Sequence, residues 1–290
     1  FLMNKIIKLS EIDSFKNHPF SVVNDESIKE LAHSIKENGL INPLIVRKKE
    51  NGRYELLSGH RRKLALELNG ETETEVNIKD LSDDEAVIFM VDSNIYREKV
   101  LPSEKAFAYK MKLDAIKHQR KSLSPKGTKS HSIDQFEDTK TQIYRYVRLT
   151  NLIPELLELV DNKLKFDSRT ILGMGLKPAV ELSYLNKDEQ NLVYSAIEYE
   201  DMTPSHGQAI RIRELSKNKK LDFDALEEIF CENKGNQNEK ISFNKEKIEN
   251  VLPKELLKRD KRYIEQYIIK AIENYKSIEL ERGDAYDLDM

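Results

Sequence analysis

Hydrophobic and polar residues follow two different spacings over the first hundred positions. One stretch repeats at the 3.6-residue period of a helix, after the capping residues Asn24-Asp25 and before Asn38-Gly39, which would end it. The apolar residues on its one face are Ile28, Leu31, Ala32 and Ile35. Three short apolar runs predict strands instead, at residues 44–46, 53–57 and 75–78. We therefore expect a compact α+β domain over residues 1–101.

Turn and capping residues support the same assignment. Asn51-Gly52, between the first two predicted strands, is the preferred two-residue hairpin turn. Ser82 and Glu85 have the spacing of a capping box, which predicts a helix from this point.

After Pro102 the strand pattern ends and the remaining periodic segments are helical. A long helix is predicted from residue 103 to about residue 120, followed by a loop at 122–129 rich in Pro, Gly, Ser and Lys. Further helices are predicted at 142–149, 154–160, 178–185, 187–198, 205–216 and 224–232. Residues 102–233 are thus expected to form an all-helical domain.

The last segment, residues 234–290, is expected to be a linker and a small C-terminal element. Residues 234–240 are polar, and 241–243 form a short strand-like run. A helix follows, with one apolar face made of Ile264, Ile268, Ala271, Ile272 and Tyr275. This face could contact a second subunit or cover the small core of the segment itself.

Composition narrows the class of protein. The chain has 290 residues, 39% hydrophobic and 34% charged, so it can form more than one domain with a heavily charged surface. Cys231 is the single cysteine, which excludes an internal disulfide and suits a reducing cytoplasm. Neither a membrane-spanning apolar run nor a signal peptide is evident, so we expect a cytoplasmic protein without membrane contact.

The distribution of charge is more informative than the net charge of −3. Residues 105–150 hold 11 Lys and Arg against 4 Asp and Glu, whereas residues 279–290 hold five acids and one Arg. A basic middle segment is typical of a local DNA-binding module, although a soluble, lysine-rich helical surface would look the same.

The segment Ser58-Gly59-His60-Arg61-Arg62 lies between a predicted strand and a predicted helix. Glycine permits a sharp turn and close approach of a ligand, and the first helical amides attract an anion. Two arginines add forked donors suited to phosphate. The segment predicts a phosphate site; the alternative is two solvated arginines on the first turn of a helix.

Asn94 and Arg97 form a second candidate site at the end of the helix that follows Ser82. Three positions apart, they share a helical face, where Asn can offer a carbonyl oxygen to Mg²⁺ and Arg can hold phosphate. The alternative is an ordinary polar helix C-terminus with an arginine favoured by the dipole.

A third candidate is the helix that follows Asp138. Thr139 is a good N-cap, and Ile143, Tyr146 and Val147 form an inward stripe. The outward residues of its first turns are Lys140, Thr141, Gln142, Tyr144 and Arg145. With residues 130–136 as the supporting helix and 137–138 as the turn, this predicts a helix-turn-helix whose second helix reads the major groove. The alternative is an amphipathic core helix with a polar outer face.

In this order, the elements resemble the ParB family of plasmid and chromosome partition proteins. The resemblance covers roughly residues 5–220 and is strongest to partition proteins of plasmids and integrative conjugative elements in Gram-positive bacteria. The segments that carry it are Ile35–Arg47, Gly59–Arg62, Asn94–Glu98, Pro102–Ala106 and the helix-turn-helix after them.

The resemblance implies a function that the residues alone only suggest. ParB proteins bind a palindromic centromere site as dimers, bind CTP with Mg²⁺, close into a sliding clamp on DNA and reopen after slow CTP hydrolysis, while a ParA-type ATPase moves the complex. Such a protein is nucleoid- or plasmid-associated. By position, Ser58, Gly59, His60, Arg61 and Arg62 would hold the triphosphate. Asn94 would hold the metal, and Arg97 would support the phosphates. Thr139, Lys140, Thr141, Gln142, Tyr144 and Arg145 would face DNA.

Three departures from the family pattern leave other functions open. Ser93 replaces the usual Glu before the Asn-x-x-Arg, which affects hydrolysis more than binding. His60 replaces a Glu between Gly and Arg, and we expect its charge to change near neutral pH. The usual Gln-Pro-Arg is missing around residues 19–22. The chain could therefore be a DNA-binding transcriptional regulator without nucleotide hydrolysis, or a small-molecule kinase on the same fold. A sulfiredoxin would need a reactive cysteine near the phosphate loop, but the single cysteine, Cys231, lies far along the chain from that loop.

Overall fold

The N-terminal part of the chain contains a five-stranded mixed sheet. The computed structural model describes residues 3–97, 100–122, 138–166, 171–231 and scattered positions between 252 and 275. The strands lie in the order β1-β5-β3-β4-β2. Their bounds are β1 Met3–Lys8, β2 Ile12–Asp13, β3 Leu44–Lys48, β4 Tyr54–Ser58 and β5 Glu73–Lys79.

The three predicted strands form, with the predicted turn between β3 and β4. Gly52 has a φ of +82°, a conformation that glycine adopts without strain, and β3 and β4 pair antiparallel across it. β1 and β2 were not predicted. They form the two outer strands, β1 paired with β5 and β2 with β4, and each partner lies some forty or more positions further along the chain.

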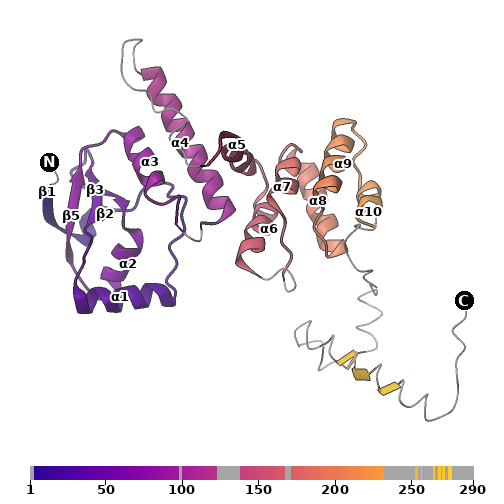
Figure 1. Ribbon diagram of the computed structural model, residues 1–290, viewed down its shortest axis with the longest axis horizontal. Coiled ribbons are helices and arrows are strands. Elements are labelled where there is room, and N and C mark those ends of the chain that lie inside the picture. The colour runs from indigo at the N-terminus through magenta and orange to yellow at the C-terminus, as the bar shows by residue number, and fades with distance from the viewer. Residues whose placement is uncertain are drawn as a thin grey trace, which may run out of the picture. The chain divides into compact units, whose positions relative to one another are not determined.

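Helices cover both faces of the sheet. α1 (Glu26–Asn38) and α2 (His60–Leu68) pack on one face, and α3 (Asp83–Asp92) on the other (Figure 1). The faces separate within β4, because Leu56 belongs to the core under α1 and α2 while Leu57 belongs to the core under α3. The predicted caps form: the Asp25 carboxylate accepts from the Ile28 amide, and Ser82 and Glu85 make a capping box.

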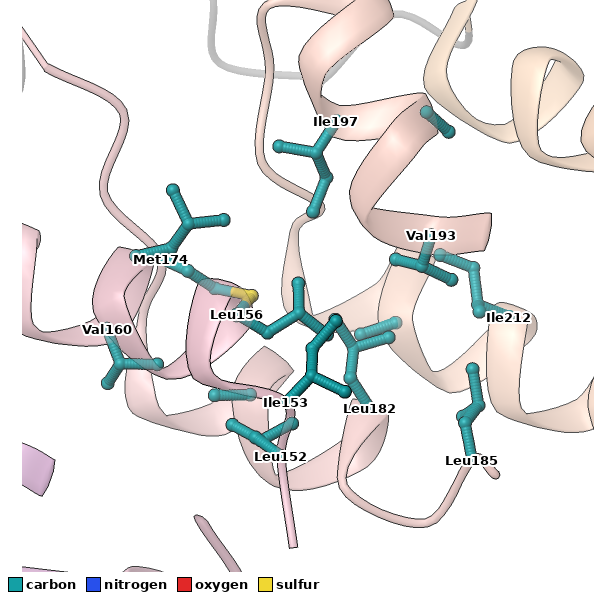
Figure 2. Close-up of a cluster of buried hydrophobic side chains, with 14 of the residues drawn as sticks. Leu152, Ile153, Leu156, Val160, Met174, Leu182, Leu185, Val193, Ile197 and Ile212 are labelled. Carbon is teal, nitrogen blue, oxygen red and sulfur yellow. The ribbon is translucent and has the colours of Figure 1, made fainter. Parts of the chain in front are cut away.

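The long helix α4 (Pro102–Ser122) packs against α3 and leads to a bundle of six shorter helices. These are α5 Lys140–Leu149, α6 Pro154–Lys165, α7 Leu176–Leu182, α8 Lys187–Glu200, α9 His206–Lys217 and α10 Phe223–Cys231. The helices predicted from residue 142 to residue 232 are present, although α7 begins and ends earlier than expected. Figure 2 shows the core of this bundle, where Leu156 of α6, Leu182 of α7 and Val193 of α8 meet.

The first turns of α4 hold together the sheet part and the bundle. Ser103 donates its amide and its hydroxyl to the Asp161 carboxylate of α6, at 2.9 and 2.6 Å. Glu104 accepts from the amide of Ser21, in the segment before α1, at 2.7 Å. Residues 1–232 accordingly form one compact unit, and residues 233–290 form a second.

In the second unit, the described positions Ile264, Ile268, Ala271 and Tyr275 are helical, as predicted. Ile272, the polar segment 234–240 and the strand-like run 241–243 lie outside the described residues, as do the loop at 123–129 and the supporting helix at 130–136. The proposed division at residue 101 stays a prediction. Among the described helices, none is long and apolar enough to cross a membrane.

Candidate functional site

The predicted phosphate segment forms the junction between β4 and α2. Gly59 is the N-cap of α2 with a left-handed φ of +104°, and a Cβ at this position would lie 2.7 Å from the Leu44 Cδ2 atom. Only glycine fits such a position without strain or a clash. All residues of the first turn of α2 lie in the described part of the chain, and this turn has neither an acidic residue nor a side-chain cap. The positive end of the helix dipole can therefore attract an anion.

Three arginines gather at this junction. Arg62 is half-buried and donates to the carbonyl oxygens of Pro43, at 2.9 Å, and Asn42. Arg61 is exposed and donates to the Ser27 hydroxyl at 2.7 Å. Arg97 is half-buried, and its pKa is lowered first by burial and then by the positive charges of Arg61 and Arg62, while Glu104 opposes the shift. This cluster of positive charge would be stabilised by a ligand with several negative charges.

Asn94, three positions before Arg97, has a side-chain oxygen without a hydrogen-bond partner. Its side chain is fully buried, and its Nδ2 atom donates to the Met90 carbonyl at 2.7 Å and to the Ser93 hydroxyl at 3.0 Å. Because the amide nitrogen is fixed by these acceptors, the opposite atom must be Oδ1, and Oδ1 has no hydrogen-bond partner. A buried acceptor without a partner costs stability unless a ligand satisfies it.

Asn94 could contribute one ligand to a hydrated Mg²⁺. Within the described residues, no group of three or more His, Cys, Asp or Glu side chains could hold a metal ion. A cation here would therefore take most of its oxygens from water and from the phosphates of a ligand, as Mg²⁺ commonly does. The residues fit a metal that arrives with a nucleotide.

His60 is buried and stacks on His18, with ring centroids 3.8 Å apart. Burial is the largest cause that lowers the pKa of His60, to about 3; the nearby His18, Arg97 and Lys63 lower it further. Our expectation that His60 changes charge near neutral pH is therefore wrong, because burial among cationic side chains keeps the imidazole neutral. Neither ring nitrogen of His60 has a hydrogen-bond partner.

Sequence reasoning missed three residues that contact this site: His18, Ser27 and Glu104. His18 donates from Nδ1 to the Phe20 carbonyl oxygen at 2.7 Å, and it lies directly before residues 19–22, where the usual Gln-Pro-Arg is missing. Ser27 contacts Arg61, and Glu104 faces Arg97. No local sequence pattern marks these three residues, because each reaches the site through a tertiary contact.

The predicted DNA-reading helix is α5. Thr139 caps it, accepting from the Gln142 amide at 3.4 Å. Ile143 is fully buried, whereas Gln142 is half-buried beside Tyr146, with which it shares a side-chain hydrogen bond. The other outward candidates are exposed: Lys140, Thr141, Tyr144 and Arg145. The helix therefore presents a polar, basic surface to solvent.

Comparison with known proteins finds similarity to nucleoid occlusion and chromosome-partitioning proteins. It is 37% identical over 103 residues to the nucleoid occlusion protein of Geobacillus thermodenitrificans, covering 36% of this chain and 37% of that protein. It is 31% identical over 210 residues to the probable chromosome-partitioning protein ParB of Campylobacter jejuni, covering 71% and 66%. Residues 3–95 match the family described as the ParB N-terminal domain. This chain belongs to the ParB family.

The ParB N-terminal match includes the α2 junction and Asn94, and it ends two positions before Arg97. The chain spans little more than a third of the nucleoid occlusion protein's length. Among solved structures, the chain resembles the C-terminally truncated chromosome-partitioning protein ParB from Caulobacter crescentus complexed to the centromeric parS site. That comparison has a TM-score of 0.42 and 15% identity, over 74% of this chain and 99% of that one.

Proposed function

We propose that this ParB-family chain is a centromere-type DNA-binding partition protein whose N-terminal domain binds CTP with Mg²⁺. The observation that carries the proposal is the cluster at the start of α2. Arg61, Arg62 and Arg97 lie close enough for their charges to interact, beside a glycine-capped helix N-terminus. Buried His60, in the first turn of α2, and buried Asn94, just after α3, each have atoms without a hydrogen-bond partner.

Each group has a role in this proposal. The amides of α2 and the guanidinium of Arg61 would bind the phosphates, since Arg61 is exposed and donates to a neutral hydroxyl, that of Ser27. Arg62 would act partly through the loop at 42–43 that it anchors. Asn94 Oδ1 would hold the Mg²⁺, which supplies charge neutralisation for the triphosphate. The choice of CTP over other nucleotides rests on the resemblance to ParB proteins.

The same proposal assigns DNA binding to α5, with Lys140, Thr141, Gln142, Tyr144 and Arg145 toward a palindromic site. Gln and Arg can each form two hydrogen bonds to a base edge in the major groove. The proposal also includes a homodimer, which is joined through residues 234–290 and closes as a clamp when CTP binds. A ParA-type ATPase is the proposed partner. Clamp closure requires that CTP bind the closed state more tightly than the open one.

Titration calorimetry of the full chain tests the proposed binding of CTP. CTP, ATP and GTP are each titrated with Mg²⁺, with and without duplex DNA. Selective heat of binding with CTP is the expected result. If a folded protein that binds DNA gave no heat with any nucleotide, the nucleotide part would be wrong.

A DNA-binding regulator without nucleotide hydrolysis is the second candidate, and Ser93 is the observation that favours it. The Ser93 hydroxyl donates to the Met90 carbonyl at 3.0 Å and accepts from Asn94, so it orients the amide but brings no carboxylate to the metal. Release of phosphate from CTP, measured with DNA present, separates the two candidates: a slow hydrolase gives turnover, and the regulator gives none.

A further inference from the structure

Tyr109 of α4 reaches the start of α5. Its side chain is fully buried, its hydroxyl donates to the Asp138 carboxylate, and its ring lies 5.9 Å from the Tyr146 ring between centroids. Burial and Asp138 both raise the pKa of Tyr109, so the hydroxyl keeps its proton and remains a donor. Asp138 immediately precedes Thr139, the N-cap of α5.

The position of Asp138 gives this contact a consequence beyond packing. Asp138 directly precedes Thr139 and Lys140 in the chain, at the end of α5 that would approach DNA. A carboxylate turned outward there would repel the phosphates of a bound duplex and oppose the attraction of Lys140. The Tyr109 hydroxyl is a strong partner because a hydrogen bond to a charged acceptor is stronger than one between neutral groups.

We propose that Tyr109 is a positioning residue for DNA binding: it holds the Asp138 carboxylate against α4 and away from the phosphates that α5 meets. The inference rests on the proposed DNA binding by α5. It adds a buried residue of another helix to the determinants of affinity, although Tyr109 itself does not touch DNA.

The test compares Tyr109→Phe, Asp138→Asn and the double variant in the full chain. The probes are a duplex that the wild-type protein selects from a randomised library and a scrambled duplex of equal length. Tyr109→Phe frees the carboxylate, and it should weaken binding to both duplexes about fivefold at low salt and less at high salt. The double variant should recover to within about twofold of wild type, because the repelling charge is gone.

Asp138→Asn alone keeps an acceptor for the hydroxyl and should bind as tightly as wild type or more tightly. Tyr194→Phe is the matched control, since Tyr194 makes a similar bond to Glu198 on α8, at 3.0 Å. The inference is overturned if Tyr109→Phe binds like wild type, if the double variant stays as weak as Tyr109→Phe, or if Asp138→Asn is weaker than wild type. A wild-type protein that binds neither duplex would instead overturn the proposed DNA binding itself.

Discussion

The rings of His18 and His60 stack at the start of α2, with centroids 3.8 Å apart and planes inclined by 34°. One histidine comes from the segment before α1 and the other from the first turn of α2. Burial lowers the pKa of both, that of His60 to about 3. The junction that would bind a triphosphate therefore contains two neutral imidazoles among three arginines.

This pair makes stability depend on pH. The unfolded chain takes up a proton at His60 near the ordinary pKa of 6.5, whereas the folded chain does so only near 3. The contribution of neutral His60 to the free energy of unfolding is therefore complete above pH 6.5. It is lost progressively as the pH falls from 6.5 toward 3. The loss at pH 5 should be about 2 kcal/mol. Urea unfolding of wild type and His60→Gln near pH 7.5 and pH 5 measures it.

The pH dependence should be flatter in His60→Gln than in wild type. His33→Gln is the control, because the His33 side chain on α1 is 73% exposed and pairs with Glu37 at the surface. If wild type and His60→Gln lost the same stability between the two pH values, the buried neutral state of His60 would be wrong.

Gly59 should tolerate no side chain. Gly59→Ala imposes both a left-handed φ of +104° on alanine and a contact of 2.7 Å with Leu44. We expect a loss of about 3 kcal/mol, since a left-handed residue costs about 1–2 kcal/mol and overpacking adds about as much. Gly52→Ala separates these causes, because Gly52 also has a positive φ but nothing within 4 Å of the added Cβ. It should cost about 1 kcal/mol, and equal losses in the two variants would contradict the clash.

Local signals explain which elements the sequence could predict. Three of these signals are the cap at Asp25, the Asn51-Gly52 turn and the capping box of Ser82. Each one involves residues no more than four positions apart in the chain. β1 and β2 lack such signals: Ile6 of β1 is 64% exposed, and the strand forms because β5, some seventy positions away, offers hydrogen bonds. Pairing over that distance leaves no periodic trace in the strand itself.

The candidate site divides in the same way. Gly59, Arg61 and Asn94 stand in short motifs, so they could be named from the sequence. His18 and Glu104 reach the site through tertiary contacts, and the neutrality of His60 is a consequence of burial. Neither the long-range contact nor the burial of a polar residue can be seen in spacing alone.

The ion pair of buried Lys112 and exposed Asp92 should respond unequally to loss of each partner. Their charged atoms lie 2.5 Å apart, but the Lys112 side chain is 0% exposed and that of Asp92 is 44% exposed. Asp92→Asn removes the carboxylate that pairs with a buried ammonium group, which should cost about 3 kcal/mol. Lys112→Met leaves a carboxylate that water can solvate and should cost less than about 1 kcal/mol. Urea unfolding of both variants, with Lys117→Met as a surface control, measures the difference, and equal costs would argue against it.

Arg61 and Arg62 should differ in what they contribute. Arg61 is exposed, so Arg61→Ala should lower CTP affinity at least about tenfold with stability changed by less than about 0.5 kcal/mol. Arg62 anchors the carbonyls of Asn42 and Pro43, so Arg62→Ala should lower both affinity and stability. Calorimetry and urea unfolding are measured on the same preparations, with Lys29→Ala on α1 as control. Unchanged CTP binding in Arg61→Ala would exclude it as a phosphate ligand.

Arg145 lies exposed on α5, and the way its loss affects DNA binding depends on what it contacts. If it reads a base, Arg145→Ala should cost about 1–3 kcal/mol on the selected duplex and little on a scrambled one. If Arg145 instead contacts a phosphate, Arg145→Ala should cost the same on both duplexes. The slope of log affinity against log salt concentration should then fall by about one. Lys140→Ala provides the comparison for a phosphate contact, and Lys36→Ala on α1 the neutral control. Fluorescence anisotropy on the two duplexes over a range of salt gives each quantity. We expect a selective loss for Arg145 and a uniform one for Lys140, because the fork of arginine can bond two acceptors of one guanine while the single ammonium of lysine cannot match that geometry.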